Sequence, residues 1–334
     1  MDAMHDQRDD GGRQRDDEDR VEPGEALRPE PGAAGAPAEP PFPAWVSGRL
    51  VPAGEPAIPA DDEGLLHGLS IYDTLLHEHG EVLFLESHLA RFSGGLAELA
   101  IELPWDPREA IAVYLAALAA EGRDLDARLL LRLTATRGTA AGGSNLVVTA
   151  RRAEVVPTGG VVLALTSTHK VAADPTEGLK STNRLRNVLA REAARAQGAW
   201  EVLFQTTDGF LSEGSISNLF LVLDGAEGPE LLTPPLADGC LAGTTRDLVL
   251  RELAAVPLVL DGRPVPCRVA KLTSRDLAAA REAFLTNSSQ RVVPVRRVLD
   301  PGGAPLGADR TAPGPVSRAV RERIETAEGR YRGA

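Results

Sequence analysis

Segments of strand length and of helix length follow one another along most of this chain, and this alternation limits its fold more than any other feature. Apolar runs such as "ARLLLRLTATRG" and "VVLALTS" have the length of buried strands. Helical spacing of apolar residues follows from about Glu86, again over 107–120, and over 183–197. A Pro-Thr-Gly-Gly break at 157–160 separates two such regions. The sequence therefore predicts two α/β lobes, an N-terminal domain at 43–157 and a C-terminal domain at 161–334.

Composition restricts the environment and the partners of the chain. Residues 1–42 are acidic and rich in Gly, Pro and Ala, so too little apolar surface is available to offset the entropy of ordering them, and we expect a disordered tail. No apolar run is long enough for a membrane helix. The start of the chain lacks the apolar core of a secretory signal, which predicts a cytoplasmic protein. A net charge of −12 argues against a nucleic-acid surface.

One lysine stands out because this chain rarely uses lysine. Lys170, Lys180 and Lys271 are the only lysines among 36 basic residues, so arginine supplies the other 33. Lys180 lies in "EGLKSTNRLRNVLARE", at the entrance to a predicted helix. A lysine amine can lose its proton and attack a carbonyl, which an arginine cannot do. This stretch alone favours a solvated residue at a helix start over a catalytic one.

Three further stretches carry polar groups that suit a binding site. "GFLSEGSISNLF" places Glu213 between apolar strands, where a buried carboxylate needs a partner. "AGTTRD" puts Thr244 and Thr245 at a helix start, a position that binds phosphate but is also an ordinary helix cap. "TNSSQ" adds hydroxyls at a strand end. "HEHG", at 77–80, is better explained as a hairpin turn than as ligands for a metal, so no metal site is predicted.

Taken in order, these motifs resemble the class IV family of pyridoxal-phosphate enzymes. That family includes branched-chain aminotransferases, D-amino acid aminotransferases and aminodeoxychorismate lyases. "GLKSTNRLRNVLAREAARAQGAWEVLFQTTDGFLSEGSISNLFLV" is similar to its central signature and "LLTPPLADGCLAGTTRDLVL" to its next block. The similarity extends from about Leu50 to Arg323. It implies fold type IV, a pyridoxal 5'-phosphate cofactor held in a cleft between a smaller N-terminal and a larger C-terminal domain, and a homodimer.

The resemblance also implies roles for individual residues. Lys180 matches the Schiff-base lysine, and Glu213 matches the acid that binds the pyridine nitrogen. The remaining matches are Arg91, Thr244, Thr245 and Ser288 for the phosphate, Leu241 against the cofactor ring, and Asn218 at the end of the glutamate motif.

The substrate side departs from the family pattern. The first-lobe loop reads "EGLLHGLSIYDTL", and Leu185 replaces the tyrosine of branched-chain enzymes. Gly142 and Ser144 stand where D-amino acid enzymes offer an arginine and a histidine for the substrate carboxylate. Tyr72 and Arg137 remain the candidates for the substrate pocket, although a purely structural role for Arg137 is equally compatible with its sequence context.

The resemblance predicts amino-group transfer between an amino acid or related amine and a 2-oxo acid. The "NRL" after Lys180 keeps an aminodeoxychorismate lyase, which releases pyruvate and 4-aminobenzoate, as the alternative. A non-catalytic family member is a third possibility. Small amino and keto acids are the expected partners, and the sequence leaves open which acid and which handedness.

Overall fold

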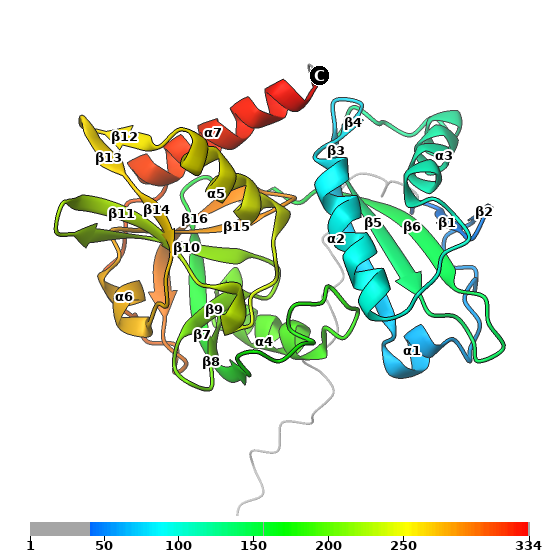
Figure 1. Cartoon of the computed structure of the whole chain (residues 1–334), viewed down its shortest axis with the longest axis horizontal. Coiled ribbons are helices and arrows are strands. Elements are labelled where there is room, and N and C mark those ends of the chain that lie inside the picture. The colour runs from blue at the N-terminus through cyan, green and yellow to red at the C-terminus, as the bar shows by residue number, and fades with distance from the viewer. Residues whose placement is uncertain (1–40, 156, 333–334) are drawn as a thin grey trace, which may run out of the picture. The chain divides into compact units, whose positions relative to one another are not determined.

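Two large β-sheets carry the fold in the computed structural model, which describes residues 41–155 and 157–332 (Figure 1). The predicted disordered tail, 1–42, lies outside the described residues except for its last two. Mixed helices and sheets of this kind confirm the α/β prediction. No helix in the described part of the chain is long and apolar enough to cross a membrane.

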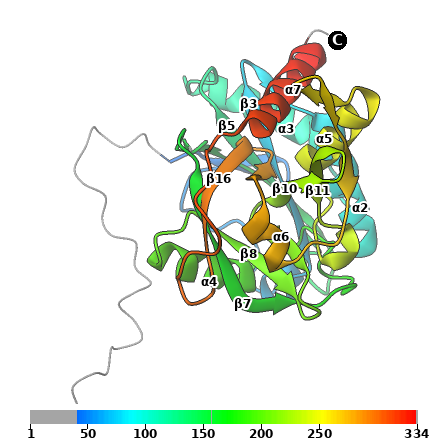
Figure 2. The same ribbon diagram turned by 90° about the vertical axis from the view of Figure 1, so that its left-hand side faces the viewer.

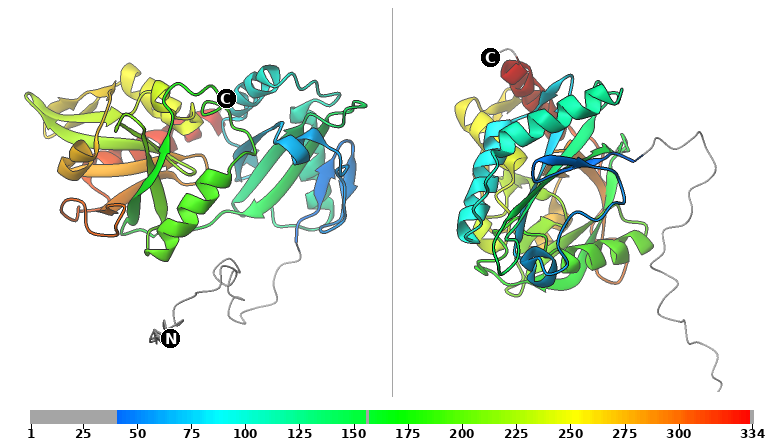
Figure 3. Two further views of the ribbon diagram at one scale, coloured as in Figure 1. Left: turned by 90° about the horizontal axis from the view of Figure 1, so that it is seen from below. Right: turned by 90° about the vertical axis from the view of Figure 1, so that its right-hand side faces the viewer.

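The first sheet has six antiparallel strands in the order β2-β1-β6-β5-β3-β4. Its strands are β1 (Ala44–Val46), β2 (Arg49–Val51), β3 (Ser70–Glu78), β4 (Glu81–Val82), β5 (Leu129–Thr136) and β6 (Asn145–Arg152). The helices of this region are α1 (Glu63–His67), α2 (Leu85–Glu98) and α3 (Pro107–Ala120). Figure 3 shows α2 and α3, in cyan and blue-green, beside this sheet.

One face of the first sheet is apolar and the other is largely polar, because side chains alternate along each strand. Leu75 of β3 pairs with Leu131 of β5, and both contribute to a core with Phe92 of α2 and Tyr114 of α3. The neighbouring positions, such as Thr74 opposite Arg132, therefore point away from this core. This second face is the one that reaches the site described below.

The second sheet is mixed and has the order β14-β11-β10-β15-β16-β7-β8-β9. Its strands are β7 (Val161–Lys170), β8 (Glu201–Thr206), β9 (Leu211–Gly214), β10 (Asn218–Gly225), β11 (Gly228–Thr233), β14 (Cys267–Val269), β15 (Glu282–Asn287) and β16 (Arg291–Leu299). A separate pair is formed by β12 (Leu258–Leu260) and β13 (Arg263–Val265). The helices here are α4 (Leu185–Ala196), α5 (Thr244–Ala255), α6 (Ser274–Ala279) and α7 (Pro315–Arg332), with a short 3-10 turn at Leu236–Asp238.

Both faces of the second sheet are covered, which explains why strand β10 has a continuous apolar sequence. Leu219 and Leu221 pack into the core shared with α6, whereas Phe220 packs into the core shared with α5 and α7. Figure 2 shows α6 apart from α5 and α7. Phe220 and Phe284 of β15 stack with ring centroids 5.2 Å apart.

Most of the predicted long elements are present, and the unpredicted elements are short. The helix expected at 107–120 spans that range, and the helix expected at 183–197 spans 185–196. Hairpin turns occur at His79-Gly80, as predicted, and at Asp208-Gly209. The sequence analysis did not identify α1, α6, β11 or the three-residue strands β12, β13 and β14.

Candidate active site

A single pocket brings together nine of the ten predicted site residues, from segments far apart in the sequence. They are Tyr72, Arg91, Lys180, Glu213, Asn218, Leu241, Thr244, Thr245 and Ser288. The tenth, Arg137, is not among the residues that line this pocket. Its guanidinium Nε lies 3.4 Å from a carboxylate oxygen of Glu63 in α1.

Lys180 is fixed by its backbone, while its amine remains without a hydrogen-bond partner. The Tyr72 N–H donates to the Lys180 carbonyl at 2.9 Å, so strand β3 holds the loop that precedes α4. Lys180 Nζ lies 4.8 Å from the centre of the Tyr72 ring. Within the described residues no hydrogen bond to this Nζ is present. Burial lowers the pKa of Lys180, with Arg91 and Arg184 contributing further.

We expect the Lys180 amine of the cofactor-free protein to titrate below the ordinary lysine value. Because the charged form is disfavoured, the neutral and nucleophilic form should be half-populated at a pH below 10.5. The rate at which an amine-reactive reagent labels Lys180, followed by peptide mass spectrometry as a function of pH, measures this midpoint. A midpoint at or above 10.5 would contradict the assignment.

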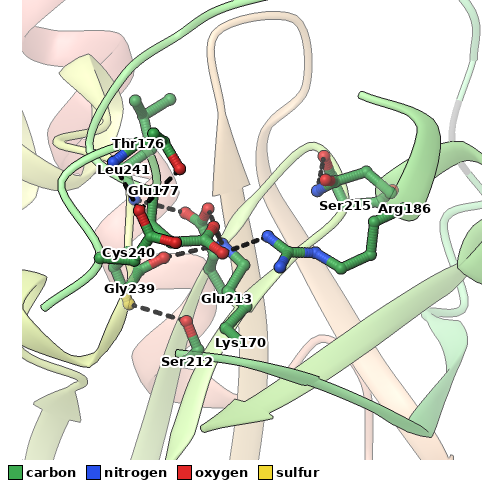
Figure 4. Close-up of polar contacts among 12 residues, drawn as sticks. Lys170, Thr176, Glu177, Arg186, Ser212, Glu213, Ser215, Gly239, Cys240 and Leu241 are labelled. Carbon is green, nitrogen blue, oxygen red and sulfur yellow. Dashed lines mark hydrogen bonds and ion pairs between the residues drawn. The ribbon is translucent and has the colours of Figure 1, made fainter. Parts of the chain in front are cut away.

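Glu213 lines the pocket, and its carboxylate accepts hydrogen bonds from three donors. Lys170 Nζ donates to Oε1 at 2.8 Å, and the Leu241 N–H donates to Oε2 at 2.9 Å (Figure 4). Asn218 Nδ2 also donates to Oε2, at 3.0 Å. A carboxylate has about four acceptor positions, so one position on Oε1 remains for a further donor. A protonated ring nitrogen would supply that donor.

Lys170 is a residue whose role the sequence analysis missed. Its side chain is 1% exposed at the end of β7. Nζ donates to Glu213 Oε1 and to the Gly239 carbonyl at 2.7 Å, and lies 3.3 Å from Glu177 Oε2 (Figure 4). Three acceptors match the three N–H donors of an ammonium group. Glu177 is paired in turn with Arg186 of α4. The only available signal was that Lys170 is itself one of three lysines in an arginine-rich chain.

The loop after Glu213 is shaped by a second buried carboxylate, Glu201 of β8. Its Oε1 accepts from the Ser215 hydroxyl at 2.6 Å, and its Oε2 accepts from the Ile216 N–H at 3.2 Å and the Ser217 hydroxyl at 3.1 Å. The serine hydroxyls of "EGSIS" therefore hold this loop against Glu201.

Arg91 is anchored by an acid that the sequence analysis regarded only as a departure from the family pattern. Arg91 Nε and NH2 donate to the two carboxylate oxygens of Asp73 at 2.9 Å and 2.7 Å, a two-point pairing. His88 Nδ1 lies 2.9 Å from the same carboxylate. Burial alone would raise the pKa of Asp73, but Arg91 and His88 outweigh it and hold the pKa well below its usual range.

The N-terminus of α5 forms an anion-binding cradle. Its N-cap is Gly243, which offers no side-chain cap, so backbone N–H groups of the first turn remain free. A Cβ on Gly243 would lie 1.9 Å from Asn218 Oδ1 and would disturb the residue that holds Glu213. Thr244 Oγ1 lies 3.2 Å from Ser288 Oγ.

Two polar atoms near this cradle are buried without a partner among the described residues. They are Thr286 Oγ1 and Asn287 Nδ2, and both residues line the pocket. Buried polar groups are normally satisfied. Together with the free helix N-terminus, these atoms fit a phosphate group or another oxyanion.

Comparisons with known proteins identify one enzyme family. A family model described as amino-transferase class IV matches residues 70–298. A chloroplastic D-amino-acid transaminase of Arabidopsis thaliana is 30% identical over 271 residues, which cover 79% of this chain and 69% of that protein. A bifunctional aminodeoxychorismate lyase / D-amino acid transaminase of Mycobacterium tuberculosis is 29% identical over 247 residues, covering 68% and 82%.

The similarity extends to solved structures. The PLP-bound form of an aminotransferase from Mycobacterium tuberculosis, described as hypothetical, matches with a TM-score of 0.70 and 25% identity, covering 85% of this chain and 98% of that one. With a family model matching more than half of its length, the chain belongs to the class IV aminotransferases.

Proposed function

We propose that this protein transfers an amino group between an amino acid, or a related amine, and a 2-oxo acid, using pyridoxal 5'-phosphate held covalently by Lys180. The observation that carries the proposal is the contrast between two lysines near Glu213. Lys170 Nζ is surrounded by three acceptors, whereas Lys180 Nζ has none among the described residues and has a lowered pKa. Of these two lysines, Lys180 is the one whose amine has no hydrogen-bond partner in the described part of the chain.

The residues that line the pocket suit both ends of the cofactor, its ring nitrogen and its phosphate. Glu213 would hold the ring nitrogen through its remaining acceptor position, and Leu241 would pack against the ring. The N-terminus of α5, with Thr244, Thr245 and Ser288, would hold the phosphate, and the unpaired Thr286 hydroxyl would gain a partner there. When bound, the cofactor supplies an aldehyde for the amine and a protonated ring that accepts electrons from the substrate Cα.

The protein's own residues would stabilise the positive charge on the protonated ring nitrogen and move one proton. The Glu213 carboxylate, which is paired with Lys170, would accept from a protonated ring nitrogen and so favour it. Lys180 Nζ would take the proton from the substrate Cα and hold it as an ammonium group. This step needs an amine with a lowered pKa.

A lyase acting on aminodeoxychorismate is the second candidate, because it uses the same lysine for its first proton transfer. Its support is the "NRL" after Lys180 and the bifunctional relative from Mycobacterium tuberculosis. A non-catalytic binding protein is disfavoured, since Lys180, Glu213 and the anion cradle line one pocket.

The test is to mix the cofactor-loaded protein with a panel of L-amino acids, D-amino acids and aminodeoxychorismate. Conversion of the cofactor spectrum to the pyridoxamine form identifies a transaminase and its handedness. Pyruvate and 4-aminobenzoate from the last substrate identify the lyase. A protein that binds no cofactor, or that changes with none of these compounds, would disprove both.

We further propose a cytoplasmic homodimer. Both cysteines are unpaired, which suits a reducing compartment. Leu185, Val188 and Leu189 of α4 are exposed, and a self-association surface would cover them. Analytical ultracentrifugation of the full chain should give a mass near twice 35.3 kDa, and a monomer at micromolar concentration would contradict the dimer.

A further inference from the structure

A second cavity lies beside the segment that joins β6 to β7, and none of its lining residues belongs to the pocket around Lys180. Its volume is about 330 Å³, within the size range of pockets for small ligands. None of the described residues that line it is acidic, and four are arginines: Arg128, Arg291, Arg318 and Arg321. This space is called the basic cavity below.

Two of the four arginines are neutralised by carboxylates that lie behind the cavity wall. Arg128 Nε lies 2.8 Å from a carboxylate oxygen of Glu78, at the end of β3. Arg291, the first residue of β16, is paired with Glu78 and also with Glu328 of α7, at 2.6 Å. The charges of these two arginines are therefore already balanced.

The other two arginines, both on α7, are balanced much less. Arg318 is exposed and donates to the Pro313 carbonyl at 2.6 Å, and within 41–155 and 157–332 it has no carboxylate at ion-pair distance. Arg321 donates to the Val292 carbonyl, and its ion-pair partner, Glu325, is 3.9 Å away and half exposed. Burial lowers the pKa of Arg321, and repulsion from two other arginines of the cavity acts in the same direction. The basic cavity therefore has an excess of positive charge on its α7 side.

A phosphate monoester has the charge and the shape that this excess requires. Arg318 and Arg321 are three positions apart in α7, so their side chains lie on the same face of the helix. Guanidinium groups bind phosphate oxygens through paired hydrogen bonds, and a phosphate monoester carries a charge of about −1.5 to −2 at pH 7. Pro294 and Pro313 add apolar surface to the same cavity, where an organic group can pack.

The turn between β15 and β16 connects the basic cavity to the anion-binding cradle of the active site. Ser288, at the start of this turn, lies 3.2 Å from Thr244 in the cradle. The next residue, Ser289, accepts at its carbonyl from Arg128 at 2.6 Å, and Gln290 lines the basic cavity. One short turn therefore contacts the cradle on one side and the basic cavity on the other.

We propose that the basic cavity is a regulatory site for a phosphate monoester, held by Arg318 and Arg321, and that its occupation stabilises the turn that carries Ser288. A bound anion would reduce the repulsion among the four arginines, so Arg128 would keep its hydrogen bond to the turn. The cofactor phosphate, which the cradle suits, would then be released more slowly. The site is separate from the pocket of Lys180, and the inference goes beyond the proposed amino-group transfer.

The binding test is calorimetric titration of the cofactor-loaded full chain with phenyl phosphate at constant ionic strength. Loading with cofactor keeps the cradle of the active site occupied, so that the titration reports on other sites. We expect one phenyl phosphate per chain. Phenyl sulfate has nearly the same shape and a single charge, and inorganic phosphate lacks the organic group, so both should bind about tenfold more weakly or less tightly still.

Arg318→Gln and Arg321→Gln should each weaken phenyl phosphate binding by about tenfold, the value of one charged hydrogen-bonded contact. Arg318 is the safer position, because its side chain is exposed and its hydrogen bond is to a neighbouring carbonyl. The matched control is Arg330→Gln, on the same helix. Arg330 is 57% exposed, is paired with Glu252 and does not line the basic cavity, so this variant should keep its affinity within about twofold.

The coupling is measured as the rate at which the cofactor leaves the loaded protein after dilution, with and without phenyl phosphate. Competition for the emptied cradle does not alter this first-order rate. We expect phenyl phosphate to slow the loss by about fivefold or more, the lower end of ordinary coupling between two sites. Arg318→Gln should abolish the slowing at the same concentration, and Arg330→Gln should retain it.

Three results would overturn the inference. The site is wrong if phenyl phosphate does not bind, or if Arg318→Gln and Arg321→Gln leave its binding unchanged. The preference for a doubly charged phosphate is wrong if phenyl sulfate binds equally well. The coupling is wrong if phenyl phosphate binds but the cofactor leaves at the same rate. Neither measurement requires turnover, so a failure of the proposed function, in which no amine changes the cofactor, remains distinguishable.

Discussion

Lys180→Arg is expected to lower kcat/KM for the best amine by at least about 10³-fold, although it preserves the positive charge. A guanidinium does not deprotonate in a protein, so it provides neither the nucleophile nor the base. The fold should survive, because Lys180 contacts strand β3 through its carbonyl, which the substitution leaves in place. Single-turnover kinetics measure the loss, and the urea midpoint checks the fold.

Lys271→Arg is the matched control for this experiment. Lys271 is 54% exposed and does not line the pocket, so its replacement should leave kcat/KM within about twofold. A Lys180→Arg protein with substantial activity would contradict the role of Lys180. Lys180→Ala should also be inactive but should regain some turnover when a small primary amine is added, since the amine can act as the missing base.

Lys170→Met is expected to cost about 3–5 kcal/mol of unfolding free energy, because it leaves the Glu213 carboxylate buried beside Glu177 without their shared cation. Cofactor affinity should fall as well, since the Glu213 carboxylate loses the Lys170 donor that helps to orient it in the pocket. Urea denaturation measures the first effect and spectral titration with the cofactor measures the second. Lys271→Met removes the same group from an exposed position and should cost less.

A double-mutant cycle separates the Lys170–Glu213 pair from general damage to the core. Glu213→Gln removes the charge that Lys170 neutralises. If the two groups interact as the structure indicates, the double variant should lose clearly less stability than the sum of the single losses. Additive losses would show that Lys170 is merely a packed side chain.

Elements with strong local signals could be predicted, and elements defined by distant partners could not. The helix at 107–120 has an Asp106 cap, a proline at its start and regular apolar spacing. In contrast, the five-residue helix α1 depends on the side chain of Asp62. One carboxylate oxygen of Asp62 caps the helix by accepting from the Gly64 N–H, and the other accepts from Thr136 and Asn145. Strand β14 has three residues and exists because it pairs with β11. No local pattern carries that information.

In the candidate site, too, residues with a local sequence motif could be predicted and residues that depend on distant partners could not. Lys180, Glu213 and Thr244 could be nominated because their own neighbours form recognisable motifs. Lys170 could not, because its role requires the pairing of β7 with β8 and the approach of Gly239. Arg137 was nominated from a local motif, but its side chain extends towards Glu63 instead of lining the pocket. Local motifs therefore nominated candidate residues in the pocket, but not the residues that hold those candidates in place.

The central claim is that Lys180, rather than its neighbour Lys170, holds the cofactor. Reduction of the cofactor-loaded protein with borohydride fixes the cofactor to the lysine that carries it, and this chain has only three lysines to distinguish. Peptide mass spectrometry should find the added mass on Lys180 alone. Label on Lys170 or Lys271, or no label in a protein that has bound the cofactor, would contradict the account.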